Sequence, residues 1–253
     1  MTVASELASL DVLNEGKSFA AFGLGYREEE LNAFNLTKSQ RYQRFVEAVE
    51  IVRRLWTEED NVSFEGIAFK LKNVTVDPKP LQKPRPPIWI AANTDAAVKR
   101  AASIGDGWMI GPHSAIDELE RQVQLCRTVW TDAGKFDAPA LPIIRETFVA
   151  ATKREAVEKA RSCLEQLYRA IYIKWKQNEA MNDPSELSWA FDKLAKGRFI
   201  LGSPSECIDQ IREYQERLGV SYLLPRFDWT PGLPQEEILA SMRLFGEKVI
   251  QKL

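Results

Sequence analysis

Short apolar runs alternate along this chain with long segments of helical periodicity. The apolar runs predict β-strands at residues 18–25, 88–92, 108–110, 142–150 and 222–227. Between them, apolar side chains recur every three or four residues, which predicts amphipathic helices such as the one over residues 40–56. Because long helical crossovers join parallel strands, the pattern predicts an α/β fold in which helices cover a parallel sheet. With 253 residues, 45% of them hydrophobic, the chain can bury a full core without disulfides or metals.

Some helix boundaries are marked by capping signals. Ser203-Pro204-Ser205-Glu206 combines a capping box with a proline at the first helical position. Ser114 with Asp117 predicts the start of another helix, which runs to about residue 132. The first predicted helix covers residues 2–13, and one of its faces carries Val3, Leu7 and Leu10.

Two segments interrupt the alternation, at about residues 58–86 and 170–198. We interpret them as insertions in a single domain that spans residues 1–253. In the first, Val62-Ser63-Phe64 and Phe69-Lys70-Leu71 flank Glu65-Gly66, which predicts a β-hairpin. The prolines between residues 78 and 87 exclude a helix or a central strand there. They predict an extended lead-in to the next strand and not a linker between domains.

Charge and cysteine content limit the classes of partner. The 34 basic and 36 acidic side chains are interspersed, so no basic stripe indicates a nucleic acid. No apolar run reaches the ~20 residues of a membrane span, and no signal peptide is visible. Cys126, Cys163 and Cys207 are far apart and odd in number, which predicts thiols in a reducing compartment and neither disulfides nor a zinc site. We therefore expect a cytoplasmic enzyme without a metal.

A buried strand followed by a helix start with small residues makes residues 88–102 the most informative segment. Asn93 and Thr94 open the helix, and N–H groups at a helix N-terminus bind phosphate. Small residues such as Ala92 and Ala97 let a ligand approach the backbone closely. The alternative, which the local pattern by itself favours, is a capped helix with an alanine-rich packing face. Asp95 fits that alternative, because its carboxylate repels a phosphate unless it points away.

Gly23-Leu24-Gly25-Tyr26-Arg27 follows the first predicted strand. Glycines at the carboxyl end of a strand let a flat ring or a phosphate lie against the backbone. A tight turn from strand to loop is an equally good interpretation. The motif lacks the spacing of a dinucleotide fingerprint and is not followed directly by a helix, so we do not interpret it as a Rossmann site.

Three charged or titratable side chains are candidates for contact with a substrate. His113, the only histidine, follows a predicted strand and could serve as a general acid or base; a loop histidine that caps the next helix is the alternative that the pattern favours. Arg145 and Arg226 lie in predicted strands, where a buried guanidinium needs a partner. That partner is either a bound molecule or an acid such as Glu146 or Asp228. No motif identifies the catalytic residues.

Taken together, these pieces resemble the bacterial-luciferase-like flavin-dependent oxidoreductases. The resemblance extends over nearly the whole chain, and its most specific motifs are Pro84-Arg85-Pro86-Pro87 before the strand, the small-residue helix, and Gly105-Asp106-Gly107-Trp108. It rests on residues 10–17, 23–30, 45–56, 64–66, 78–90, 93–102, 105–108 and 202–206. It implies a (β/α)8 TIM barrel with FMN, or alternatively the deazaflavin F420, at the carboxyl ends of the strands.

The resemblance also assigns candidate residues. It implies that the cofactor phosphate is held at the helix after residues 88–92, by Ala92, Asn93, Thr94 and Ala97. It further implies that the strand before Gly23, Gly25 and Tyr26 passes beside the flavin ring. The implied reaction is monooxygenation of a small organic substrate with reduced flavin and O₂, or hydride transfer with F420. The protein would supply position and exclude water, while the cofactor supplies the chemistry.

Family members carry three strand–helix units before the segment that matches residues 2–13. We therefore expect an incomplete barrel, from a misassigned start or a truncated gene product. Unpaired edges would lower solubility or lead to homo-oligomers, and a separate flavin reductase is a further expected partner. Two alternatives stay open: a catalytically impaired protein that binds flavin or a partner subunit without turnover, and a barrel enzyme that acts on a sugar phosphate.

Overall fold

The chain forms two compact units, as seen in a computed structural model that describes residues 1–228 and 232–253 apart from the side chain of Ala180. One unit holds Met1–Ala91 and Ile104–Gly107, and the other holds Ala92–Ser103 and Trp108–Leu253. The single-domain interpretation stays a prediction. The elements are α1 (Thr2–Leu13), β1 (Ala20–Phe22), α2 (Glu28–Ala33), α3 (Arg41–Thr57), β2 (Val62–Glu65), β3 (Lys70–Val74), β4 (Ile88–Ala92), α4 (Asp95–Ile104), β5 (Gly107–Ile110), α5 (Ile116–Asp132), β6 (Pro142–Val149), α6 (Lys153–Gln166), η1 (Leu167–Tyr172), η2 (Gln177–Ala180), η3 (Glu186–Ser188), α7 (Phe191–Ala195), β7 (Ile200–Gly202), α8 (Pro204–Leu218), β8 (Tyr222–Arg226), α9 (Gln235–Lys248) and η4 (Ile250–Lys252).

In the first unit, α1 packs on α3. Ala4 and Ala8 are fully buried at this contact, and the indole of Trp56 donates a 2.8 Å hydrogen bond to the carbonyl of Ala4. The more apolar face of α1 is not the buried one, because Val3 and Leu10 are both about half exposed. Small side chains decide this packing, since they let the two helices approach closely.

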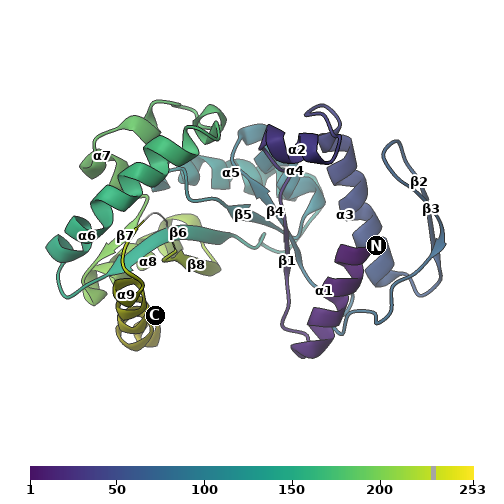
Figure 1. Cartoon of the computed structure of the whole chain (residues 1–253). Coiled ribbons are helices and arrows are strands. Elements are labelled where there is room, and N and C mark those ends of the chain that lie inside the picture. Colours follow the sequence, from purple (N-terminus) through teal and green to yellow (C-terminus); the bar gives the residue numbers. More distant parts are fainter. Residues whose placement is uncertain (229–231) are drawn as a thin grey trace. The chain divides into compact units, whose positions relative to one another are not determined.

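Strand β1 pairs in parallel with β4, with Ala20 opposite Ile88 and Phe22 opposite Ile90. The prediction that this strand is buried on both faces is wrong, because Ala20 is buried while Ala21 is exposed. An apolar run by itself does not establish burial, because many apolar side chains of a folded protein remain at its surface, and here Phe19 is exposed and Phe22 is only half-buried. The predicted hairpin is confirmed: β2 and β3 form a separate antiparallel sheet (Figure 1).

In the second unit, β6 is the central strand. Its first half pairs in parallel with β8, from Pro142 opposite Tyr222 to Glu146 opposite Arg226, and its second half pairs in parallel with β7 (Figure 1). Strand β6 also pairs in parallel with β5, with Ile110 opposite Ile143. The predicted α/β class with a mostly parallel sheet is therefore confirmed.

The boundary predictions have mixed outcomes. The capping box at Ser203 is present, with Ser203 N–H donating to the Glu206 carboxylate at 2.9 Å. The predicted cap at Ser114 is wrong: α5 has Ala115 as its N-cap, with no side-chain hydrogen bond. Strand β7 was not predicted, because three apolar residues directly before a capping box carry too little periodicity.

Residues 170–198, predicted as an insertion, fold as short helical pieces after α6 and η1. Leu187, Phe191 and Leu194 from this segment are buried against Tyr168 and Phe199 in one apolar core. The three cysteines are free and buried. Within the described residues, no helix is long and apolar enough to cross a bilayer.

Candidate functional site

Helix α4 begins directly after β4 and presents N–H groups in its first turn. Thr94 caps this start, since its Oγ1 accepts a 3.2 Å hydrogen bond from Ala97 N–H and its carbonyl accepts one from Val98 N–H at 2.8 Å. In the described parts of the chain, the N–H groups of Asp95 and Ala96 have no acceptor. Two unpaired donors at the positive end of a helix dipole are suited to an anion.

The carboxylate of Asp95 is held by other groups. Arg121 donates to both of its oxygens, at 2.8 and 2.6 Å, and Gln122 donates a third hydrogen bond at 3.1 Å. These hydrogen bonds, with the Arg121 contribution the largest, lower the pKa of Asp95. Its negative charge is therefore paired with a guanidinium, which Asp95 shares with Glu118, and this pairing weakens the repulsion of an anion at this helix start.

Gly111 brings the side chains of Asn93 and His113 to one place. A Cβ at position 111 would lie 2.7 Å from Asn93 Oδ1 and 3.4 Å from His113 Nδ1. The missing side chain leaves the space that these two polar groups occupy. Asn93, a predicted cofactor residue, and His113, a predicted substrate residue, thus lie beside the same glycine.

We expect Gly111→Ala to destabilise the protein by about 1 kcal/mol, because the added methyl group would lie 2.7 Å from Oδ1 of the half-buried Asn93 and must displace that side chain. Urea-induced unfolding measures this loss. Gly246→Ala in α9 is the matched control, since a Cβ there meets nothing within 4 Å. The control should gain up to about 1 kcal/mol from helix propensity. Equal effects in both variants would contradict the close packing around Gly111.

The loop that carries His113 is fixed by buried side chains. Arg145 donates to the carbonyl of Gly111 at 3.1 Å and to that of Ser114 at 3.2 Å. Between these two, the Pro112 carbonyl accepts a 3.0 Å hydrogen bond from the Tyr168 hydroxyl, and the His113 carbonyl accepts a 2.7 Å hydrogen bond from Arg198. All four consecutive carbonyls of residues 111–114 therefore have a side-chain donor, which holds the loop in one conformation.

The His113 imidazole lies in a shielded position with an unusual lack of partners. The residue as a whole is partly accessible, yet both ring nitrogens are buried and have no hydrogen-bond partner among the described residues. Burial, followed by the positive charges of Arg145, Arg198 and Arg226, lowers its pKa to about 3. The ring is therefore neutral near pH 7 and is a poor general base. It does not cap α5, whose N-cap is Ala115.

A second chain of contacts links Arg226 to the middle of β6. Arg226 donates to the hydroxyl of Tyr172 at 2.8 Å, and that hydroxyl lies 3.2 Å from Glu146 Oε1. The ring of His113 packs edge-on against the same tyrosine, with 4.6 Å between ring centres. Arg226 also pairs with Asp228 at 3.0 Å, as one of the alternatives predicted. His113 and Arg226 therefore converge on Tyr172.

Arg145, the third predicted substrate residue, is fully buried, and its guanidinium packs over the ring of Tyr214. The carbonyls named above occupy its NH1 and NH2 groups, so its evident role is to hold the loop. A substrate contact for Arg145 stays an untested prediction.

The remaining predicted cofactor residues belong to the first unit. Gly25 has a φ of +75°, and a Cβ at this position would meet nothing within 4 Å, so the backbone here favours glycine and faces open space. Its carbonyl accepts a 2.9 Å hydrogen bond from Arg41. Gly23 and Tyr26 are exposed. These features allow a ligand to approach the backbone but do not identify one.

Sequence reasoning missed Tyr168, Tyr172 and Arg198 and treated Glu146 only as a partner for an arginine. One signal was available: Arg145 and Glu146 are consecutive in a strand, so they point to opposite faces. Both are fully buried. Two adjacent charges inside a strand therefore require polar partners on each face of the sheet.

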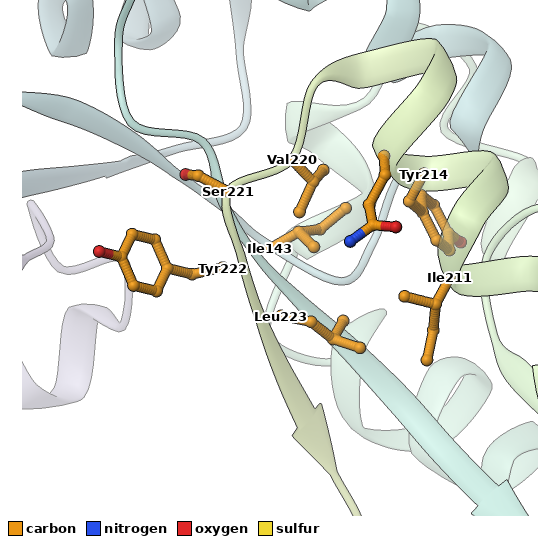
Figure 2. Close-up of a pocket in the computed structure, with 8 residues that line it drawn as sticks. Ile143, Ile211, Tyr214, Val220, Ser221, Tyr222 and Leu223 are labelled. Atoms are coloured by element: carbon orange, nitrogen blue, oxygen red, sulfur yellow. The ribbon is translucent and has the colours of Figure 1, made fainter. Parts of the chain in front are cut away.

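A small pocket in the second unit is lined in part by Tyr214, the residue over whose ring Arg145 packs. Figure 2 shows Ile143, Ile211 and Leu223 around it, whereas the ring of Tyr222 points away. Its lining residues Ile143 and Tyr222 stand near the amino ends of β6 and β8. Parallel α/β enzymes place their chemistry at the opposite, carboxyl ends, so we assign this pocket no function.

Comparisons with known proteins agree with this arrangement. The F420-dependent glucose-6-phosphate dehydrogenase of Microbacterium testaceum (strain StLB037) is 28% identical over 265 residues, which cover 99% of this chain and 73% of the relative. The crystal structure of the monooxygenase RslO1 from Streptomyces bottropensis superposes with a TM-score of 0.81 at 27% identity and covers 99% of this chain and 73% of that one. The oxygenating constituent of 3,6-diketocamphane monooxygenase from Pseudomonas putida, in complex with FMN, has a TM-score of 0.76 at 17% identity, with 100% and 76% covered, and shows the fold alone.

The sequence model of the luciferase-like monooxygenases matches residues 1–221. This match covers most of the chain and confirms the resemblance found in the sequence. The solved relatives are luciferase-like barrel enzymes, which also confirms the predicted fold family; closure of a barrel stays a prediction. The chain therefore belongs to the luciferase-like monooxygenase family of flavin- and F420-dependent oxidoreductases.

Proposed function

We propose that this protein is a flavin-dependent oxidoreductase, with FMN as its cofactor and a monooxygenase reaction on a small organic substrate. The observation that carries the proposal is the start of α4, where two unpaired N–H groups meet an ion-paired Asp95. Ala92, Asn93, Thr94 and Ala97 would hold the cofactor phosphate there. When bound, the flavin supplies the redox chemistry.

The residues present fit such a group. A phosphate accepts hydrogen bonds only, and this helix start offers donors without any competing free carboxylate. Ala92 and Ala97 present no bulky side chain. For the ring, the proposal keeps the predicted contacts at Gly23, Gly25 and Tyr26, and the open backbone at Gly25 is compatible with them.

At the substrate end, we propose His113 and Arg226. His113 would offer a neutral imidazole, which can donate or accept one hydrogen bond without changing the charge of the site. Arg226 would meet an oxygen atom of the substrate, since a guanidinium presents several donors in a fixed plane. In this proposal, Arg145 acts on the substrate only through the loop that it holds.

Hydride transfer with F420 is the second candidate. A specific observation favours it: the dehydrogenase relative that covers 99% of this chain is F420-dependent. FMN and F420 both carry a phosphate, so the same helix start could accept either. Binding measurements with both compounds decide between them.

We expect Ala96→Glu to weaken FMN binding by about tenfold or more, because it places a carboxylate beside the proposed phosphate site. Fluorescence quenching of FMN and of F420 by the purified chain measures the affinity. Ser103→Glu is the matched control, an exposed position near the opposite end of α4 that should leave binding unchanged.

The outcomes separate the alternatives. Tighter quenching of F420 than of FMN would support the second candidate. Quenching without oxygen uptake in the presence of NADH and a flavin reductase would support a protein that binds flavin without turnover. If neither compound binds, or if both glutamate variants lose affinity equally, the proposed phosphate site is wrong.

Self-association and a separate reductase partner stay predictions. The first unit exposes apolar side chains of α1, with Leu13 81% exposed, and such a surface is compatible with an oligomer. The oligomeric state in solution can be measured directly by analytical ultracentrifugation.

A further inference from the structure

The hydroxyl of Tyr168 has two acceptors but only one hydrogen. It lies 3.0 Å from the carbonyl oxygen of Pro112 and 3.0 Å from Glu146 Oε2. A carbonyl can only accept, so the hydrogen of Tyr168 must point to Pro112 for that contact to be a hydrogen bond. The contact with Oε2 is then also a hydrogen bond only if Oε2 itself carries a proton. If Glu146 were ionised, the Tyr168 hydrogen could point to only one of the two acceptors. At the other contact, lone pairs of two oxygen atoms would face each other without a hydrogen between them.

The other oxygen of Glu146 needs no proton. Arg226 donates to the Tyr172 hydroxyl oxygen at 2.8 Å, which leaves the Tyr172 hydrogen to point at Glu146 Oε1, 3.2 Å away. The Tyr172 hydroxyl, the Glu146 carboxyl and the Tyr168 hydroxyl then each donate one hydrogen bond, all in the same direction along the chain of contacts. The chain of hydrogen bonds runs from the Arg226 guanidinium through Tyr172, Glu146 and Tyr168 to the Pro112 carbonyl.

The surroundings favour the neutral acid. Glu146, Tyr168 and Arg145 have no exposed area. Burial raises the pKa of Glu146 despite the opposing effects of its hydrogen bonds with its own backbone and with Tyr168, and of the charges of Arg226 and Arg145. The other charged or titratable groups facing the cluster are His113, Arg198 and Asp228. His113 is neutral, Arg198 pairs with Glu186, and Asp228 is largely exposed to solvent.

We infer that Glu146 is a protonated carboxylic acid at neutral pH and acts, through Tyr172, as the positioning residue for Arg226. A neutral Glu146 adds no negative charge beside Arg226, and the ion pair of Arg226 with Asp228 is exposed to solvent, so Arg226 can attract a carboxylate or phosphate group of a ligand. The positioning role rests on the proposed substrate contact of Arg226. The protonation of Glu146 does not, and it can be tested in the absence of flavin.

Infrared spectroscopy of the full chain, with Glu146→Gln as the reference variant, tests the protonation. At pH 7 the difference spectrum should show the loss of one carboxylic acid C=O band, which shifts on transfer to D₂O. Glu186→Gln is the matched control, and it should show the loss of carboxylate bands, because Glu186 pairs with a guanidinium. A Glu146→Gln spectrum that loses carboxylate bands would overturn the inference.

The link to Arg226 has its own readout. Tyr172→Phe removes one donor to Glu146 and should move the acid C=O band to higher frequency. Arg226→Met, which removes the donor to Tyr172, should move the same band in the same direction by a smaller amount. Arg161→Met, at an exposed ion pair with Asp192, should leave it unchanged. An unchanged band in both Tyr172→Phe and Arg226→Met would overturn the positioning role, whether or not Glu146→Gln folds and whether or not the chain binds flavin.

Discussion

Arg145→Leu should destabilise the protein by about 3–5 kcal/mol, a large part of the total stability of a domain. Arg145 has no exposed area, and its guanidinium donates to the carbonyls of Gly111, Ile144 and Ser114. Leucine fills part of the volume but leaves these acceptors without donors, and each buried unsatisfied group costs about 1–3 kcal/mol. The loop at residues 111–114 would then relax, and His113 would move with it.

Urea denaturation measures the loss, and two further variants calibrate it. Arg145→Lys keeps the charge but has a single ammonium group in place of the planar fork, so an intermediate loss is expected. Arg154→Ala removes an 87% exposed arginine with one ion pair at 4.0 Å and should change stability by less than about 0.5 kcal/mol. A loss below about 1 kcal/mol for Arg145→Leu would show that water replaces the guanidinium and that the loop does not depend on it.

The elements of this fold could be predicted wherever periodicity was sustained. Residues 142–149 form a strand because every position but Ile144 is buried, and a run of this length is visible in the sequence. The Ser203 capping box was readable because its chemistry is local. Pairing was not readable: the sequence contains nothing that places β8 beside the first half of β6 and β7 beside the second half. That arrangement depends on how helices and strands pack in three dimensions.

Only some residues of the candidate site could be predicted from the sequence. His113 and Arg226 stood out as single residues of unusual chemistry at strand ends. Tyr168 and Tyr172 did not, because they lie in what reads as the continuation of a helix. In the structure this segment is a π-helix, and its hydrogen-bond pattern changes which side chains share a face. This change from an α-helix to a π-helix could not be predicted from the side-chain pattern, and it places the hydroxyl groups of both tyrosines next to Glu146.

Acidification from pH 7 to about pH 4.5 should cost the wild-type protein about 2 kcal/mol more stability than it costs His113→Phe. The folded-state pKa of His113 is lowered to about 3 from an ordinary value near 6.5. The unfolded chain therefore takes up a proton below about pH 6.5 that the folded chain refuses, so the His113 contribution is complete above pH 6.5 and is lost as the pH falls. Between about pH 6.5 and pH 4.5, each pH unit corresponds to about 1.4 kcal/mol of stability. We expect about 2 kcal/mol in total, less than the full sum over this range, because His113 is partly accessible to solvent.

The comparison of the two proteins isolates this one group. Glu146 is present in both proteins. Because its folded-state pKa is raised, its contribution to stability falls as the pH rises above the pKa of the unfolded chain, and this contribution cancels in the difference between the two proteins. Because the chain has a single histidine, its imidazole resonances in proton NMR can be assigned without ambiguity. They should not titrate between pH 7 and pH 5 in the folded protein. The opposite outcome is that stability falls equally with pH in the two proteins and that the His113 imidazole titrates with a midpoint near pH 6.5. It would mean that the ring reaches solvent and that the loop held by Arg145, Tyr168 and Arg198 opens readily.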